Sequence, residues 1–311
     1  MNRWLYSAIQ ETWAISQTWL NPLFLETLAA APRKQRLPKV EGNVAVMPLY
    51  GMIVQRGSIF QEIFGGTSTQ SFGAAFTRAI NHDQISAVVI DIDSPGGTVA
   101  GVEELGDILH QGAQIKPVAA VANSSANSAA YWLGSQAGPG RFFAAPGADV
   151  GSIGVYRMHV DESEAAAKQG VKFEFMGMPE FKTEGNQFAP LTEEAKAHNM
   201  AQVQQNYDSF VKAVARGRGV TAANVRNNFG KGRSFHGNIA QEMGMIDKIS
   251  TLGAVLAELG VVTKATAMSA AQVQVTTELC MAWESGLPVG MEKQPTINFD
   301  LRKRKLFALT N

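Results

Sequence analysis

Short apolar runs alternate with helical stretches between residues 43 and 145. Each run is almost entirely apolar and is followed by polar or turn residues, which is typical of strands buried on both faces. The stretches 72–80 and 102–111 carry apolar residues at helical spacing. This alternating order predicts an α/β domain with parallel strands. The predicted strands are Asn43–Leu49, Ser86–Asp91, Pro117–Ala122 and Arg141–Ala145.

The second half of the chain begins with a long predicted helix. Thr192 and two glutamates stand at its start, basic residues stand at its end, and Gly217 is the expected stop. Beyond the last predicted helix the sequence is rich in Ala, Thr and Ser and then irregular, which predicts a flexible tail over residues 263–311. The predicted helices are 191–216, 221–227 and 252–259.

The first thirty residues carry Ile9, Trp13 and Leu20 at roughly helical spacing. This predicts an amphipathic arm that packs on its own body or on a neighbouring subunit. Polar residues interrupt every apolar run well before the roughly 18 residues of a membrane span, and the zones of a signal peptide do not follow in order, so we expect neither. The predicted division is an arm and linker over 1–38, a main domain over 39–262 and the tail over 263–311.

Composition narrows the function classes. The 311 residues are 45% apolar and 17% charged, with 27 basic against 27 acidic side chains, as in an ordinary soluble globular protein. A pI near 7 offers no bulk attraction to nucleic acid or an anionic membrane. The single cysteine, Cys280, excludes an intramolecular disulfide and a cysteine-rich zinc module.

Two motifs follow predicted strands. Gly96 and Gly97 end the segment Asp91–Gly97 (DIDSPGG). Adjacent glycines let backbone N–H groups point into a cleft, as an oxyanion hole requires, although a tight turn has the same pattern. Ser128 lies in Asn123–Trp132 (NSSANSAAYW), where a strand leads into a helix. A serine there is either a helix cap or a nucleophile favoured by the helix dipole.

Two further motifs lie downstream. Gly151–Val155 (GSIGV) is a strand-like segment broken by glycine, and Lys182 lies in a polar loop just before the long helix. A lysine in such a loop is ordinarily a solvated surface charge. It acts as a general base only where burial favours the neutral amine.

Taken in order, these motifs resemble the signal peptide peptidase A family of serine peptidases, which use a Ser/Lys dyad. The series is DSPGG, a serine followed by small residues and an aromatic, GSIG, and a lysine ahead of a Leu-Thr-Glu-Glu helix. Gly232–Asp247 (GRSFHGNIAQEMGMID) is similar to the closing element of the family. The resemblance covers about residues 40–259. It implies an SppA-like peptidase domain with the ClpP/crotonase-type fold, a β-superhelix of repeated strand-strand-helix units.

The resemblance also implies roles for five residues. Ser128 matches the nucleophile, Lys182 the general base, and Ser152 the serine that holds the lysine amine. The backbone N–H groups of Gly97 and Ala129 match the oxyanion hole. Two alanines, beginning with Ala129, stand where many members have two glycines, and their methyl groups narrow the cleft. No cofactor and no metal are implied.

Other functions stay open. A ClpP-like peptidase uses Ser, His and Asp, and His159 is the histidine near GSIGV. A crotonase-fold acyl-CoA enzyme uses a similar oxyanion hole without the serine nucleophile. A degenerate peptidase with a closed site serves as a structural or assembly factor.

The organisation of the chain is closest to the lambda-type phage prohead proteases of this family. This implies a serine endopeptidase that matures a phage or prophage capsid, located in the host cytoplasm or the prohead. A bacterial cytoplasmic SppA-like peptidase is the alternative. The expected partners are polypeptides, such as capsid or scaffold proteins, with no nucleic acid and no membrane span.

Two consequences concern the assembled protein. The family completes its groove with neighbouring subunits, so we expect a homo-oligomer, and Trp4, Trp13 and Trp19 are candidate contacts. The small-residue stretch Thr263–Ala271 suits a narrow peptidase groove, which predicts self-cleavage within or close to it; an inert linker is the alternative.

Overall fold

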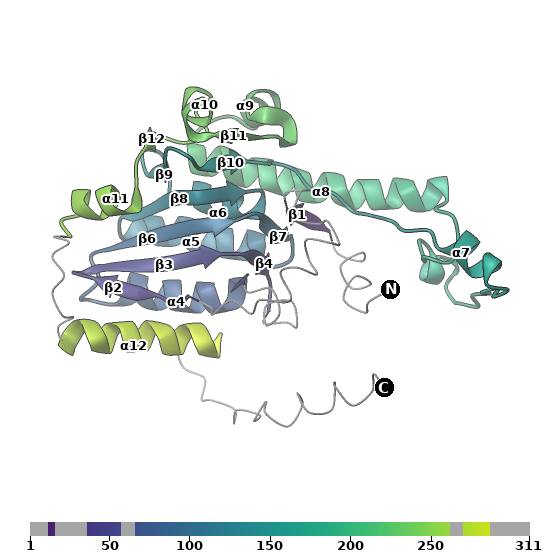
Figure 1. Cartoon of the computed structure of the whole chain (residues 1–311), viewed down its shortest axis with the longest axis horizontal. Coiled ribbons are helices and arrows are strands. Elements are labelled where there is room, and N and C mark those ends of the chain that lie inside the picture. Colours follow the sequence, from purple (N-terminus) through teal and green to yellow (C-terminus); the bar gives the residue numbers. More distant parts are fainter. Residues whose placement is uncertain (1–11, 16–35, 57–65, 262–269, 287–311) are drawn as a thin grey trace.

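The computed structural model describes residues 12–15, 36–56, 66–261 and 270–286, and its centre is an eight-stranded sheet (Figure 1). The apolar runs form its middle strands, which pair in parallel, while antiparallel strands lie at both edges. The predicted α/β domain with parallel strands is confirmed. The strands are β2 (Lys39–Glu41), β3 (Val44–Tyr50), β6 (Ala87–Ser94), β8 (Val118–Asn127), β9 (Phe142–Ala144), β10 (Asp149–Gly151), β11 (Ser234–His236) and β12 (Lys248–Ile249).

Helices cover both faces of this sheet. Because alternate strand residues face the same side, Val88 and Ile90 of β6 join the main core, whereas Val89 joins a smaller core on the other face. The main core packs against α4 (Thr69–Asn81), α5 (Val102–Ile115) and α6 (Ala129–Ser135), and the smaller one against α11 (Leu252–Glu258). Ser68 begins α4, since its side chain accepts a hydrogen bond from the Ser71 N–H.

A second, four-stranded sheet lies where β3 and β6 end. Its order is β1 (Trp13–Ile15), β7 (Gly96–Thr98), β4 (Met52–Val54) and β5 (Gly66–Ser68). The chain passes from β3 into β4 through Gly51, whose φ of 65° lies in the left-handed region that glycine enters without strain. It passes from β6 into β7 through Pro95, and Gly96 and Gly97 are the first two residues of β7.

Helix α8 (Glu193–Arg218) runs beyond the sheet, and residues 157–192 lie at its start (Figure 1). From here on, the arm means residues 157–192 and not the N-terminal segment over 1–38. The predicted stop at Gly217 is wrong, because α8 ends at Gly219, which has a φ of 65°. Gly217 serves packing instead: a Cβ there would lie 2.3 Å from the carbonyl oxygen of Ser135. The shorter helices are α7 (Ser163–Lys168), η2 (Glu180–Thr183), α9 (Ala222–Asn228), η3 (Gly230–Gly232) and α10 (Gly237–Glu242).

The expected tail contains a packed helix, α12 (Ala270–Ser285), which corrects the prediction of a flexible segment for these residues. Leu279 and Trp283 are almost fully buried, and the Trp283 ring meets Phe72 of α4 edge to face at 5.6 Å. Arg78 and Glu278 form an ion pair between the same helices. Composition alone had suggested a tail, but apolar residues four apart give this helix a face that packs on α4. The predicted cleavage stretch lies almost wholly outside the described residues.

The expected helix around Trp13 is also corrected, because residues 13–15 form strand β1. Trp13 is buried against its own chain, while Trp4 and Trp19 lie outside the described residues. None of the helices in the described ranges is both long and apolar enough to cross a membrane.

Candidate active site

Ser128 lies between β8 and α6 in an uncommon backbone conformation. Its φ is 55° and its ψ is −118°, and such a conformation in a non-glycine residue costs of order 1–3 kcal/mol. Two backbone hydrogen bonds hold it: the Ser128 N–H donates to the Gly151 carbonyl, and its own carbonyl accepts from Trp132 N–H. The hydroxyl lies 3.4 Å from the carbonyl oxygen of Gly154. Because the side chain makes no cap hydrogen bond to α6, the helix-cap interpretation of Ser128 is not supported.

The glycine pair approaches Ser128 closely. A Cβ on Gly96 would lie 2.9 Å from the Ser128 Cβ, and one on Gly97 would lie 1.8 Å from the Ile53 carbonyl oxygen. Only glycine fits either position. The buried Ser94 hydroxyl fixes the turn by donating to the Gly51 carbonyl at 2.6 Å and accepting from the Gly96 N–H at 3.1 Å. The backbone of β7 therefore passes beside Ser128.

The start of α6 supplies the second side of this site. Ala129 is the first residue of the helix, and the first N–H groups of a helix have no partner within it. These groups and the helix dipole favour negative charge at this end. Ala129 and Ala130 are both fully buried, so their methyl groups occupy space that two glycines would leave empty.

Ser152 lies immediately after β10 and also has a positive φ, 52°. Its N–H donates to the Arg233 carbonyl, so the closing element sets its position. Sequence reasoning missed two residues that join these parts: the Ser234 hydroxyl donates to Asn127 Oδ1 at 2.7 Å, directly before Ser128. The sequence could have indicated both residues, because Asn127 directly precedes the candidate nucleophile and Ser234 lies within the closing motif.

Lys182 is not brought to Ser128 within one chain. It lies in η2 on the arm and is exposed. Ser128 is 1% exposed in the body, and none of the hydrogen bonds of either residue in the described structure joins the two. The separation of arm and sheet is visible in Figure 1.

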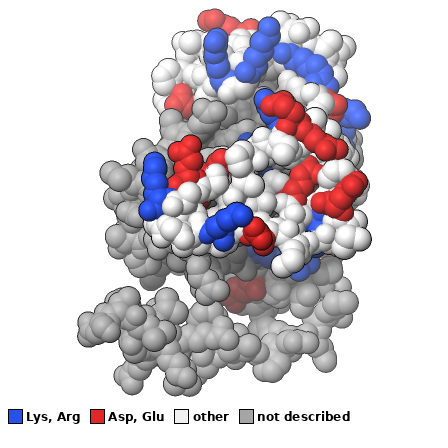
Figure 2. Space-filling view, turned by 90° about the vertical axis from the view of Figure 1, so that its right-hand side faces the viewer, with Lys and Arg blue, Asp and Glu red and all other residues white. Residues whose placement is uncertain are grey.

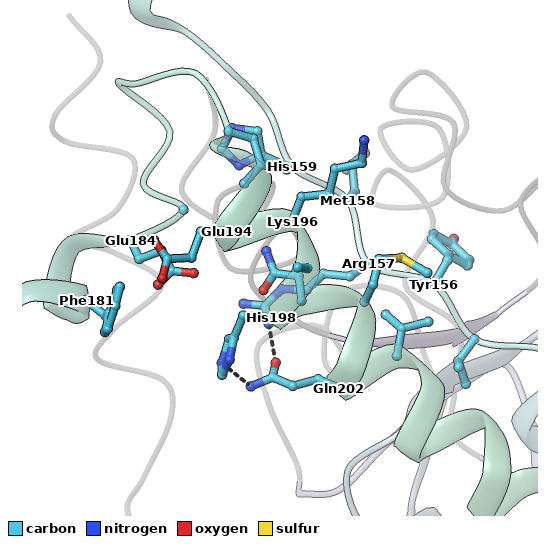
Figure 3. A pocket seen from close by; sticks show the side chains of 17 residues that line it. Tyr156, Arg157, Met158, His159, Phe181, Glu184, Glu194, Lys196, His198 and Gln202 are labelled. Atoms are coloured by element: carbon cyan, nitrogen blue, oxygen red, sulfur yellow. Dashed lines mark hydrogen bonds between the residues drawn. The ribbon is translucent and has the colours of Figure 1, made fainter.

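A cavity of about 890 Å³ lies at the base of the arm, and Ser128 is not among the residues that line it (Figure 3). Arg157 donates to Gln202 at 2.8 Å, and Gln202 lies 3.1 Å from the ring of His198. His159 lines this cavity and makes no contact with Ser128 that would support a Ser-His pair. A smaller cavity of about 600 Å³ reaches Ser152 instead.

Buried polar groups lie near the other end of the DIDSPGG strand. Burial raises the pKa of the Asp91 carboxyl, against the lowering effect of hydrogen bonds from Tyr50 and Asn123. Burial also raises the pKa of Tyr156, beside the site, to about 12. Tyr156 therefore stays neutral at physiological pH and adds no charge to the site.

Comparison with known proteins decides the family. The model of Peptidase family S49 matches residues 110–266, a span that contains Ser128, Ser152, Lys182 and the closing element. The chain belongs to Peptidase family S49. This confirms the resemblance that the order of motifs had indicated.

Curated relatives agree with the family. The chain is 27% identical over 266 residues to the head-tail preconnector protein GP5 of Enterobacteria phage P21, covering 86% of this chain and 52% of that protein. It is 28% identical over 218 residues to the capsid assembly protease C of Escherichia phage lambda, covering 70% and 49%. Protease 4 of Haemophilus influenzae is 24% identical over 229 residues, covering 73% and 36%. The chain thus spans about half the length of its phage relatives.

Among solved structures, a ClpP1 mutant from Listeria monocytogenes is similar at a TM-score of 0.40 and 14% identity. That match covers 66% of this chain and 91% of the other.

Proposed function

We propose that the chain is a serine endopeptidase with Ser128 as its nucleophile. The observation that carries this proposal is the strained backbone of Ser128 at the start of α6, beside a glycine pair that leaves no room for side chains. Such strain persists where surrounding structure enforces it, and it clusters at active sites.

The chemistry follows from these positions. The Ser128 hydroxyl attacks the carbonyl carbon of a peptide bond, and its proton passes to a general base. The backbone N–H groups of Gly97 and Ala129 stabilise the negative oxygen that forms. The base then returns the proton to the leaving amine as the carbon–nitrogen bond breaks. Water then attacks the resulting ester and gives a proton to the base, and the base returns this proton to the Ser128 oxygen as the ester bond breaks.

Lys182 is proposed as the base, supplied by a second copy of the chain. A lysine amine accepts a proton only where its surroundings favour the neutral form, as burial does. Lys182 is exposed on the arm of its own chain. Docking of the arm on another body would bury the amine beside Ser128. The hydroxyl of Ser152, which lines the 600 Å³ cavity, would then hold the amine in place.

The surface of the arm supports such docking. It exposes a set of large apolar side chains, and exposed clusters of this kind mark interaction sites. Met176 and Met178 are 95% and 89% exposed, and Phe173 stacks on Phe188 at 3.9 Å without becoming buried. Figure 2 shows the side of the molecule that carries the arm, with charges of both signs interspersed among uncharged residues. The partly exposed apolar residues of the arm also include Val171, Phe175 and Phe181.

Capsid maturation is the proposed biological role. The names of two phage relatives, a head-tail preconnector protein and a capsid assembly protease, support capsid or scaffold polypeptides as substrates. Host cytoplasm or prohead is the corresponding location. We also propose the superhelical arrangement of strand-strand-helix units, which the succession β6, β7 and α5 supports.

A fluorophosphonate probe tests the nucleophile. The probe phosphonylates an activated serine with loss of fluoride, so wild-type protein is expected to gain one adduct mass that peptide mapping assigns to Ser128. Ser128→Ala is expected to gain none and to lose peptide hydrolysis, to below about 1% of wild type. Ser125→Ala is the matched control and is expected to label normally. Labelling that persists in Ser128→Ala would contradict the proposal.

A further inference from the structure

The N-terminal strand β1 lies in the groove beside Ser128. It pairs with β7 on one side, in the register Trp13 with Thr98, Ala14 with Gly97 and Ile15 with Gly96. On its other side Trp13 exchanges both backbone hydrogen bonds with Tyr156, at 2.9 and 3.0 Å. A segment of the chain's own sequence is therefore held between the glycine turn and the segment that follows Ser152.

The pairing of β1 with β7 involves Gly97, whose N–H group is the candidate oxyanion donor. The Val99 N–H donates to the Thr12 carbonyl at 3.1 Å. Hydrogen-bonded pairs alternate along an antiparallel ladder, so the next such pair is Ala14 with Gly97. A Cβ on Gly96 would lie 2.2 Å from the Ala14 carbonyl oxygen and 2.9 Å from the Ser128 Cβ. The Ala14 carbonyl thus lies next to the proposed nucleophile.

The side chains of β1 fill the groove. Ala14 is fully buried, and Trp13 and Ile15 are each 2% exposed. Side chains of a strand alternate, so Trp13 and Ile15 share one face and Ala14 points to the other. Ile15 lines the 600 Å³ cavity together with Ser152 and Tyr156. The occupied groove accepts a large apolar residue, a small residue and a large apolar residue in succession.

We propose that Thr12–Ile15 occupies the peptide-binding groove of the active site as an internal competitor of substrate. Substrates take its place as an extended strand that pairs with β7 and Tyr156, and they share its large–small–large apolar pattern. This inference rests on the proposed peptidase function, because it places the competitor beside Ser128. A three-residue strand is only weakly stable, so a substrate strand is able to displace it.

Binding of a peptide tests the occupancy without requiring catalysis. The probe is a fluorescently labelled octapeptide of residues 10–17, Gln-Glu-Thr-Trp-Ala-Ile-Ser-Gln. The host is the full chain with Ser128→Ala, which prevents turnover. Adding Ala14→Arg places a long charged side chain where a methyl group is fully buried, and so expels β1. Adding Ala254→Arg instead makes the same change at an exposed position on α11 and is the matched control.

The Ala14→Arg protein is expected to bind the octapeptide at least about tenfold more tightly than the Ala254→Arg protein, because only the former has a free groove. An octapeptide with Arg in place of Ala is expected to bind neither. Equal binding of the first peptide by both proteins, or by neither, would overturn the inference. Because no hydrolysis is measured, this result is independent of whether the proposed function holds.

Kinetics test the competition in chains that keep Ser128. With an unrelated peptide substrate, Ala14→Arg is expected to lower KM about tenfold and leave kcat unchanged, since freeing the groove raises the binding-competent fraction alone. Ala254→Arg is expected to match wild type. Hydrolysis by all of these chains with an unchanged KM would overturn the inference, whereas absence of hydrolysis from all of them would overturn the proposed function.

A disulfide supplies a variant that does not depend on a bulky side chain. Trp13 and Thr98 form a non-hydrogen-bonded antiparallel pair, whose Cα separation of about 4.5 Å suits a disulfide. With Cys280→Ser, the pair Trp13→Cys and Thr98→Cys is expected to lose at least about tenfold in kcat/KM when oxidised and to regain it on reduction. An oxidised form as active as the reduced form would overturn the inference.

Discussion

Ser128 shows how one residue combines two structural roles. It ends β8 and begins α6, and its positive φ turns the chain sharply between them. The carbonyl of Gly151 accepts its N–H, so the segment that carries Ser152 also holds the backbone of Ser128. A change in β8 or in β10 is therefore expected to shift the backbone of the proposed nucleophile.

Gly96→Ala is the sharpest test at this scale. Its φ of 102° is unsuited to alanine, and the new Cβ would press on Ser128 and on the Ala14 carbonyl. We expect peptide hydrolysis to fall at least about a hundredfold, as for loss of oxyanion stabilisation, and unfolding free energy to fall by about 1–3 kcal/mol. Hydrolysis assays and urea unfolding measure the two effects. Gly138→Ala, also at positive φ but with open space around it, is expected to lose only stability.

The sequence indicates which residues are candidates for the site, but it does not indicate how all of them are arranged. Gly97 and Ser128 follow β6 and β8, two strands that the apolar runs predict, and Ser152 follows β10, which pairs with β8. Lys182 has no such strand before it. It lies in a polar loop. The sequence around it therefore does not indicate whether Lys182 lies near Ser128 of its own chain or near Ser128 of another copy.

Elements were predictable where local pattern and tertiary packing agree. The four predicted strands are apolar runs, α4 and α5 carry apolar residues at helical spacing, and α8 has a threonine cap at its start and basic residues in its last turn. Strand β1 had no such signal, because three residues pair only through contacts distant in sequence. Helix α12 did carry a signal, the spacing of Val275, Leu279 and Trp283, which the small-residue composition before it obscured.

A partly buried ion pair between Arg218 and Asp247 anchors the closing element. Arg218 is bidentate to Asp247 at 2.7 and 2.8 Å, and the Asp247 carboxyl also accepts the Phe142 N–H of β9. Burial opposes ionisation of Asp247, but these hydrogen bonds hold its pKa below the usual value. A carboxyl with a lowered folded pKa contributes stability above its unfolded pKa, near 3.9, and loses it as pH falls through the folded pKa.

Asp247→Asn is expected to lower the unfolding free energy by about 3–5 kcal/mol at neutral pH, because Arg218 keeps a buried charge without its partner. The difference from wild type should shrink as pH falls below about 4. Urea unfolding at a series of pH values measures both. Glu258→Gln, which breaks the exposed pair with Lys248, is the control and should cost less than about 1 kcal/mol. An Asp247→Asn difference that stays constant with pH would contradict this account.

At the scale of the whole molecule, the proposed site is divided between the body and the arm. The body holds the proposed nucleophile, the glycine pair and the proposed groove, while the arm carries Lys182 and an exposed apolar surface. The body follows from the pattern of strands and helices. For the arm, the sequence predicts only a polar loop with a lysine.

Sharing of the site between copies is tested by complementation. Ser128→Ala and Lys182→Ala proteins, carrying different tags, are coexpressed and their mixed assemblies isolated through both tags. Each variant alone is expected to be inactive, whereas mixed assemblies should hydrolyse peptide because some sites combine an intact Ser128 with an intact Lys182 from another copy. Lys182→Ala mixed with the double variant Ser128→Ala, Lys182→Ala contains no intact base and should stay inactive. Mixed assemblies of the two single variants that are as inactive as this control would contradict the account.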